Sequence, residues 1–195
     1  RLGLHLLNGA GAAARLEDLT HTQQTLELWS GRLLSSFELD GIRVEVETSV
    51  HPELDVVIVQ LRSALLEQGH LGVDLTFPGV STRLNPDAAD WQNPEAHRTI
   101  ERSRDQRTLR LERELDAARH QVWVSSDHAL DIRQTAPHQY RLRAHDTRSL
   151  TLLVGFFEHA PPSALPAAEA ARAAVAQHWQ QFWQSGGAVD FTGSK

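Results

Sequence analysis

Alternating apolar and polar positions recur along most of the chain and predict short β-strands. Ile42, Val44 and Val46 alternate with charged residues, and a second run at 33–38 precedes them. The alternation places the branched side chains on a buried face and the charges in water. Between the two runs lies Asp40-Gly41, and both residues tolerate positive φ. The pattern therefore predicts a tight hairpin.

Other segments extend this all-β pattern. Residues 55–61 (DVVIVQL) are apolar on both faces, which predicts a strand in the middle of a sheet. Residues 71–77 alternate again, so the four strands between 33 and 77 are expected to form an antiparallel meander. Further strands are predicted at 2–7, 108–115, 120–125, 130–133, 140–144 and 150–157. About ten short, regularly spaced strands indicate a large two-sheet antiparallel β-sandwich.

One alanine-rich helix is predicted at residues 164–183. Ser163 is expected to cap it, and Pro166 is expected in its first turn, where a missing N–H costs little. Gly186-Gly187 is expected to stop it. Its apolar stripe ends in three large rings: Trp179, Phe182 and Trp183.

Residues 80–107 break the strand pattern, with two Asn-Pro steps and an isolated tryptophan, Trp91. Structureless loops of this length are uncommon inside compact domains and are usually functional or disordered. Trp91 could stack on a sugar ring, and His97 and Arg98 could hydrogen-bond its hydroxyls. The alternative, that Trp91 only pins the loop to the sheet, stays open.

Composition excludes several classes of function. The net charge of −6, from 19 basic and 25 acidic residues, argues against nucleic-acid binding. The chain has no cysteine, which excludes disulfides, a thiol nucleophile and zinc-thiolate sites. No apolar run approaches the roughly 18 residues of a membrane span. The compartment stays open, cytoplasmic or exported.

The residues that carry chemistry elsewhere form no recognisable motif in this chain. The 11 histidines show neither helical i, i+4 pairs nor His-x-His pairs, so no metal is expected, and no cofactor motif is present. There is no G-x-S-x-G elbow or phosphate-binding loop. We expect no catalytic residue in this segment. Three acidic pairs are predicted to be solvated: Glu38/Asp40, Glu45/Glu47 and Glu112/Glu114.

Several stretches together match one known group of proteins. They are Trp-Ser-Gly at 29–31, a threonine strand running into His-Pro at 48–52, Ser-Ala-Leu-Leu at 63–66, Phe77-Pro78, PEAHRT at 94–99 and WQQFWQSGGAVDFTGSK at 179–195. On these motifs the chain resembles the N-terminal β-sandwich of glycoside hydrolases related to family 65. The resemblance implies a galactose mutarotase-like super-sandwich.

In that family the sandwich leads through a linker into an (α/α)6 barrel, the six-hairpin glycosidase fold, which holds the catalytic acid. The resemblance thus implies an accessory domain of an enzyme that hydrolyses or phosphorolyses glycosides. Its expected partners are that barrel in the same polypeptide and an oligosaccharide or glycoside. Residues 1–160 would form the sandwich, and 161–195 the helix and the start of the linker. The chain lacks methionine, and we expect it to be a piece of a larger protein that self-associates when alone.

Two other functions remain open. The first is a free-standing carbohydrate-binding module with Trp91 as its platform. The second is a mutarotase-like epimerase, which needs a histidine acid and a glutamate base in one cleft; its candidates are His97, His120 and His128. The sequence leaves the substrate, the linkage and the oligomeric state open.

Overall fold

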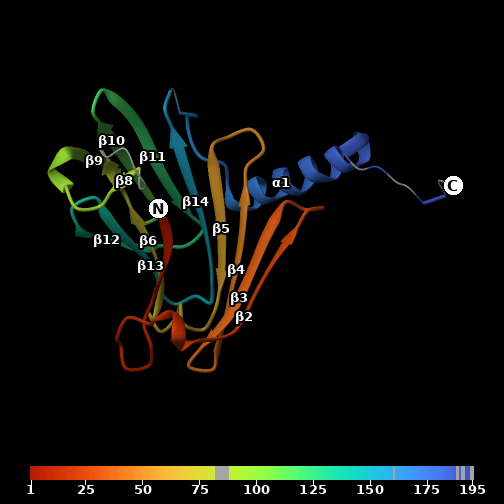
Figure 1. The fold of residues 1–195 in the computed structure, drawn as a ribbon, viewed down its shortest axis with the longest axis horizontal. Coiled ribbons are helices and arrows are strands. Elements are labelled where there is room, and N and C mark those ends of the chain that lie inside the picture. Colours follow the sequence, from red (N-terminus) through yellow and green to blue (C-terminus); the bar gives the residue numbers. More distant parts are fainter. Residues whose placement is uncertain (82–87, 160, 188, 190–191, 194–195) are drawn as a thin grey trace.

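The computed structural model describes residues 1–195 except 82–87, 160, 188, 190–191 and 194–195. Part of the predicted 80–107 loop and most of 188–195 therefore lie outside the described residues. The described chain is mainly β, with two large antiparallel sheets and one C-terminal α-helix (Figure 1). The predicted fold class is confirmed.

The larger sheet has eight strands in the order β2-β3-β4-β5-β14-β11-β10-β9, and every neighbouring pair is antiparallel. Its strands are β2 (Leu19–Glu27), β3 (Arg32–Leu39), β4 (Ile42–Val50), β5 (Val56–Arg62), β9 (His97–Arg104), β10 (Thr108–Leu115), β11 (Ala118–Ser126) and β14 (Ser149–Phe157).

The smaller sheet has four strands in the order β1-β6-β13-β12. They are β1 (Leu2–Leu6), β6 (Leu71–Thr76), β12 (Leu130–Ala136) and β13 (Gln139–Ala144). A two-stranded ribbon joins β7 (Gly79–Val80) to β8 (Ala89–Asp90), and two 3-10 turns, η1 (Leu16–Asp18) and η2 (Pro94–Ala96), connect strands.

The apolar core lies between the two sheets. Leu61 of β5 faces Leu75 and Leu142 of the smaller sheet within one buried cluster. Burying a leucine side chain contributes about 1.5–3 kcal/mol. This shared core joins the sheets into a sandwich.

The hairpin and the central strand form where the sequence predicts them. Asp40 and Gly41 have φ angles of 52° and 74° and join β3 to β4. Two successive positive φ angles are typical of the type I′ turn, whose twist matches that of the strands. β5 lies in the middle of the larger sheet, between β4 and β14, because both of its faces are apolar.

The predicted meander is correct only as far as β5. β6 crosses to the smaller sheet and pairs with β1 and β13 instead of β5. The strand β2 was not predicted, because its side chains are mostly polar and exposed at the sheet edge. The predicted loop is also too long, since its last part forms the edge strand β9, whose charged residues hide the alternation.

The helix α1 (Ala168–Phe182) is shorter than predicted. Its N-cap is Ala167, so Ser163 does not cap it and Pro166 lies before its first turn. Beyond it a distorted turn, η3 (Trp183–Gly187), contains Gly186 at a φ of 109°, which ends the regular helix as expected. None of the described helices has the length and apolarity to cross a membrane.

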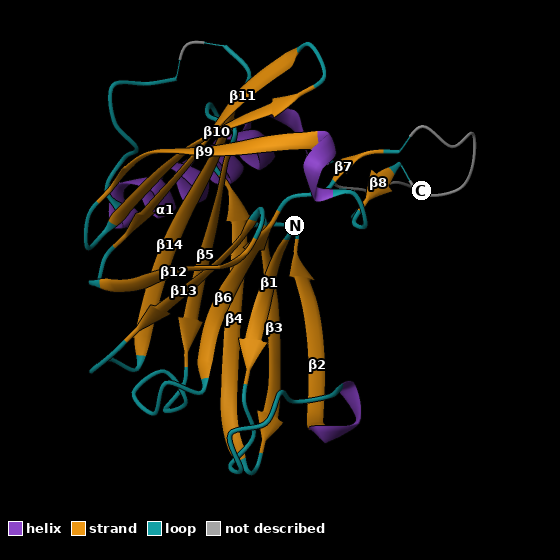
Figure 2. Ribbon diagram, turned by 90° about the vertical axis from the view of Figure 1, so that its left-hand side faces the viewer, coloured by secondary structure: helices purple, strands orange, loops and turns teal. Residues whose placement is uncertain are grey.

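The helix covers the outer face of the larger sheet. Figures 1 and 2 show α1 and the smaller sheet on opposite faces of that sheet. Ala171 and Val175 of α1 are buried against Val56, Ile58 and Leu153 in a second apolar cluster. The outer face is thus apolar beneath α1, and it is polar beside it.

Candidate functional site

The three residues singled out from the sequence lie in different surroundings. Trp91 follows β8 and is 46% exposed. His97 begins β9 and is 7% exposed, whereas the next residue, Arg98, is exposed and pairs with Glu114 at 3.6 Å. Successive residues of a strand point to opposite faces. His97 and Arg98 therefore do not face one another, and the role of all three in sugar binding stays a prediction.

His97 belongs to a buried group that we call the histidine corner, formed by His97, Thr99, Arg113 and His138. Arg113 Nη1 donates to His97 Nδ1 and to Thr99 Oγ1, both at 2.7 Å. Thr99 Oγ1 lies 2.7 Å from His138 Nδ1, and His138 Nε2 donates to the Pro94 carbonyl at 2.7 Å. This chain of hydrogen bonds ties η2 to the larger sheet, so it is His138 that pins this part of the loop.

Burial governs the ionisation of the histidine corner. Desolvation, followed by the charges of His138 and Arg113, lowers the pKa of His97 to about 4. Desolvation also lowers the pKa of Arg113 to about 10, so its guanidinium stays charged at neutral pH. Neutral His97 can then accept the hydrogen bond from Arg113.

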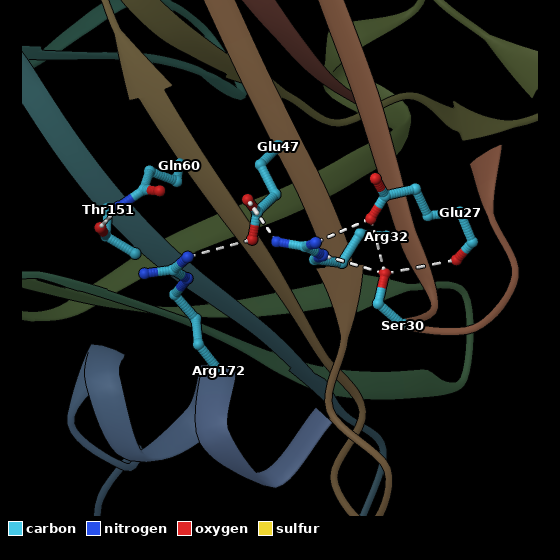
Figure 3. Close-up of polar contacts among 7 residues, drawn as sticks. All are labelled: Glu27, Ser30, Arg32, Glu47, Gln60, Thr151 and Arg172. Carbon is cyan, nitrogen blue, oxygen red and sulfur yellow. Dashed lines mark hydrogen bonds and ion pairs between the residues drawn. The ribbon is translucent and has the colours of Figure 1, made fainter. Parts of the chain in front are cut away.

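A different polar group lies on the outer face of β2–β5, next to α1. Its centre is Glu47, whose side chain is 17% exposed and pairs with Arg32 at 3.4 Å and with Arg172 of α1 at 3.3 Å. Arg32 also donates to Glu27 at 2.7 Å, and Ser30 donates to the same carboxylate oxygen (Figure 3). These two hydrogen bonds lower the pKa of Glu27, and the bond from Ser30 has the larger effect.

Strand register explains why these side chains share one face. Thr25 lies opposite Leu34, Leu34 opposite Glu47, and Glu47 opposite Gln60. The row ends at Thr151 of β14, opposite Gln60. Cross-strand neighbours point to the same side of a sheet. The row therefore crosses five strands on the outer face.

The outer face is hollowed along this row. The cavity, which we call the polar hollow, has a volume of about 420 Å³. That lies within the roughly 300–1,000 Å³ typical of small-molecule pockets. Its lining includes Glu27, Arg32, Glu45, Glu47, Gln60 and Arg62.

The residues of the polar hollow correct a prediction about the acidic pairs and bear on the epimerase hypothesis. Glu45 is exposed as predicted, but the Glu47 side chain is 17% exposed and forms two ion pairs. Outside the hollow, Glu112 and Glu114 were also predicted to be solvated, but their side chains are 19% and 18% exposed and form ion pairs as well. A lone glutamine in the apolar run 55–61 was the available signal for the hollow, since a buried amide needs partners. The three histidines of the epimerase hypothesis are not among the residues that line it. Within the described residues no group of three or more potential ligands is placed to hold a metal.

A third feature is an aromatic surface formed by Trp29, Trp179, Phe182 and Trp183. Trp183 Nε1 donates to the Leu28 carbonyl at 2.9 Å, and the rings of Trp29 and Trp183 lie 4.9 Å apart. Trp29 is 69% exposed and Phe182 is 44% exposed. The end of α1 and the β2–β3 turn thus present one apolar patch to solvent.

Comparison with known proteins identifies the fold. No family model matches the sequence, and no curated protein matches it. A solved structure described as "Putative kojibiose phosphorylase from human microbiome" has a similar fold, with a TM-score of 0.59 and 10% sequence identity. The match covers 93% of this chain and 27% of that chain. The chain therefore has the β-sandwich fold that the resemblance to family 65 implies, and it spans about a quarter of the phosphorylase it matches.

Proposed function

We propose that this chain is an accessory domain of an enzyme that hydrolyses or phosphorolyses glycosidic bonds. The observation that carries the proposal is the fold match, which takes in nearly all of this chain and 27% of a phosphorylase. The remainder of such an enzyme is large enough to hold a separate catalytic domain. Here residues 1–160 act as the sandwich, and 161–195 lead toward an (α/α)6 barrel.

The aromatic surface is the proposed contact with that barrel. Leu26 and Leu28 are also exposed beside Trp29 and extend the patch. Contiguous exposed apolar surface marks interaction sites in soluble proteins. On its own the domain is expected to self-associate through this surface.

Four described carboxyl groups, Glu27, Asp105, Glu112 and Asp127, have a pKa below the usual value. Glycoside cleavage needs one protonated and one ionised carboxyl group, and the protonated one requires a raised pKa. None of these four groups is therefore suited to act as that acid.

The test compares the 195-residue chain with the longest open reading frame that contains it. We expect the longer protein to release glucose or glucose 1-phosphate from α-glucosides such as kojibiose, and the 195-residue chain to release neither. Trp29→Ala with Trp183→Ala should lower the stability and activity of the longer protein. Leu16→Ala, which alters an exposed apolar residue on η1 outside the aromatic surface, is the control.

Two results would contradict the proposal. One is glycoside cleavage by the 195-residue chain itself. The other is a reading frame in which no further domain accompanies this one.

A further inference from the structure

The polar hollow contains a buried polar group that the described protein does not satisfy. Gln60 is 9% exposed, and its Nε2 donates to Thr151 Oγ1 at 3.4 Å. Its Oε1 is buried and accepts no hydrogen bond from any described residue. Figure 3 shows the amide oxygen turned away from Thr151. Leaving such a group unpaired costs about 1–3 kcal/mol.

Exchanging the positions of Oε1 and Nε2 in the Gln60 side chain does not give both atoms a partner. Oε1 would then accept from the Thr151 hydroxyl, and Nε2 would lack an acceptor in its place. In either orientation one terminal atom of Gln60 is left without a partner among the described residues, and Gln60 is one of the residues that line the hollow. A ligand hydroxyl can satisfy either atom, since it both donates and accepts.

The charges in the hollow favour a neutral ligand. Three carboxylates (Glu27, Glu45, Glu47) face three guanidinium groups (Arg32, Arg43, Arg62), so the lining has no net formal charge. An anion or a cation would meet as many repulsive as attractive groups. A ligand with many hydroxyls can accept from the guanidinium groups and donate to the carboxylates.

The hollow also retains groups that are available for binding. Arg62 is exposed and forms no ion pair with any described residue, although Glu45 lies opposite it. Glu45 pairs instead with Arg43 at 3.0 Å, where both side chains are about half exposed. Leu34 adds an apolar surface suited to the C–H face of a sugar ring.

We propose that the polar hollow is a binding site for a neutral mono- or disaccharide, with Gln60, Glu45 and Arg62 as its hydrogen-bonding residues. The choice of a sugar rests on the proposed function, whereas the preference for a neutral hydroxylated ligand rests on the hollow alone. The site is distinct from Trp91, which is not among the residues that line it.

The experiment is a titration of the ¹⁵N-labelled 195-residue chain with kojibiose, maltose and glucose, followed by amide chemical shifts. We expect saturable shifts confined to β2–β5 and the start of α1. Glucuronate and glucosamine, which carry a charge, are expected to bind at least about tenfold more weakly. Saturation curves give the dissociation constants.

Three variants test whether Arg62, Glu45 and Gln60 contribute to sugar binding. Arg62→Ala and Glu45→Ala alter exposed side chains and should leave the fold intact, and each should weaken binding about tenfold, which corresponds to one hydrogen bond to a charged group. Gln60→Leu should have a similar effect. Arg133→Ala, an exposed arginine on β12 in the other sheet, is the matched control and should bind as the parent does.

Absence of saturable shifts with all three neutral sugars would overturn the proposal. So would binding that Trp91→Ala abolishes and the Arg62 and Glu45 variants leave unchanged, because the site would then lie at the tryptophan. Either result leaves the proposed accessory role intact, since that role is tested by the activity of the longer protein.

Discussion

The histidine corner and the polar hollow both contain arginine side chains, but the partners of these arginines differ. Arg113 is 1% exposed and has no carboxylate partner among the described residues; its guanidinium donates to neutral acceptors and lies 4.8 Å from the ring of Phe77. At the hollow, Arg32 of its lining and Arg172 of α1 share the carboxylate of Glu47. In the histidine corner, buried neutral acceptors stabilise the charge of Arg113. At the polar hollow, the charged groups stay within reach of a ligand.

This difference separates the histidine corner, which has a structural role, from the polar hollow, which is the proposed binding site. Arg113 Nε also lacks an acceptor among the described residues, yet it lies in the packed interior against an aromatic ring, where a cation–π contact compensates in part. Gln60, whose amide also carries an unpaired atom, is one of the residues that line a cavity. We infer that unsatisfied polarity indicates function only where a ligand can reach it.

The largest effect is expected from Arg113→Met. The substitution leaves the acceptors His97 Nδ1 and the carbonyls of Pro78 and Arg98 without their donor. We expect a loss of about 4 kcal/mol in the free energy of unfolding, because each orphaned buried acceptor costs about 1–3 kcal/mol and removal of a buried charge offsets part of it. Urea unfolding measures the loss.

The matched control is Arg98→Met, which removes an exposed arginine of the neighbouring strand and should cost less than about 1 kcal/mol. Equal unfolding midpoints for the two variants would show that the histidine corner does not hold the fold.

The second largest effect is a pH dependence in which His97 of the histidine corner has the largest part. His97 has a pKa of about 4 in the folded protein, against an ordinary value of 6.5. Between these values the unfolded chain binds a proton that the folded protein excludes, so stability falls as the pH drops from 6.5 to 4. The loss should reach about 3 kcal/mol, and urea unfolding at several pH values measures it.

His97→Gln, which keeps an acceptor but does not titrate, should reduce this slope to the smaller part that His5 and His120 contribute, since burial also lowers the pKa of each. Glu27→Gln in the hollow should leave it unchanged. Its lowered pKa makes Glu27 contribute stability above the ordinary value of 4.5, and that stability is lost only at lower pH. An undiminished slope in His97→Gln would assign the titration to another group.

The third effect concerns the helix α1, whose Arg172 pairs with Glu47 in the lining of the hollow. Gly31 has a φ of 62°, and a Cβ atom there would lie 1.8 Å from Trp179 Nε1. Gly31→Ala should therefore displace α1 and Arg172 with it, at a cost of about 3 kcal/mol. Gly41→Ala is the control, since Gly41 has a φ of 74° but nothing within 4 Å of its Cβ position.

The control should cost about 1 kcal/mol from backbone strain alone. Thermal unfolding and near-UV circular dichroism of Trp179 measure the difference. Equal effects of the two substitutions would mean that α1 can move without loss, so that it does not hold Arg172 against Glu47.

The sequence predicts the sandwich well because its central strands carry strong local signals. Asp40-Gly41 has one favourable backbone solution, and the doubly apolar run at 55–61 fits only the middle of a sheet. The path of β6 was not predictable in this way, since alternation shows which face is buried but not which strand lies beside it. Edge strands such as β2 and β9 were missed because solvent contacts both of their faces.

The candidate sites were harder to predict for a related reason. His97 was singled out as a surface ligand group, but it is enclosed by Arg113 on the adjacent strand β10 and by His138 in the turn between β12 and β13. Glu47 was predicted to be solvated because nothing in the sequence indicates that α1 brings Arg172 to it. In both cases the environment of the side chain depends on contacts with residues elsewhere in the chain, and local sequence patterns do not indicate such contacts.

The smallest effect, that of the Glu47–Arg172 pair, tests how the hollow is held together. Both side chains are partly exposed, so we expect a coupling energy of about 0.5–1 kcal/mol in a double-mutant cycle of Glu47→Gln and Arg172→Gln. The Glu112–Arg102 pair, a surface pair on β9 and β10, is the matched cycle and should give no more than this. A coupling near zero at Glu47 would mean that this ion pair does not hold α1. Glu47 would then keep only Arg32 as an ion-pair partner among the described residues, and the contrast with the enclosed Arg113 would become sharper.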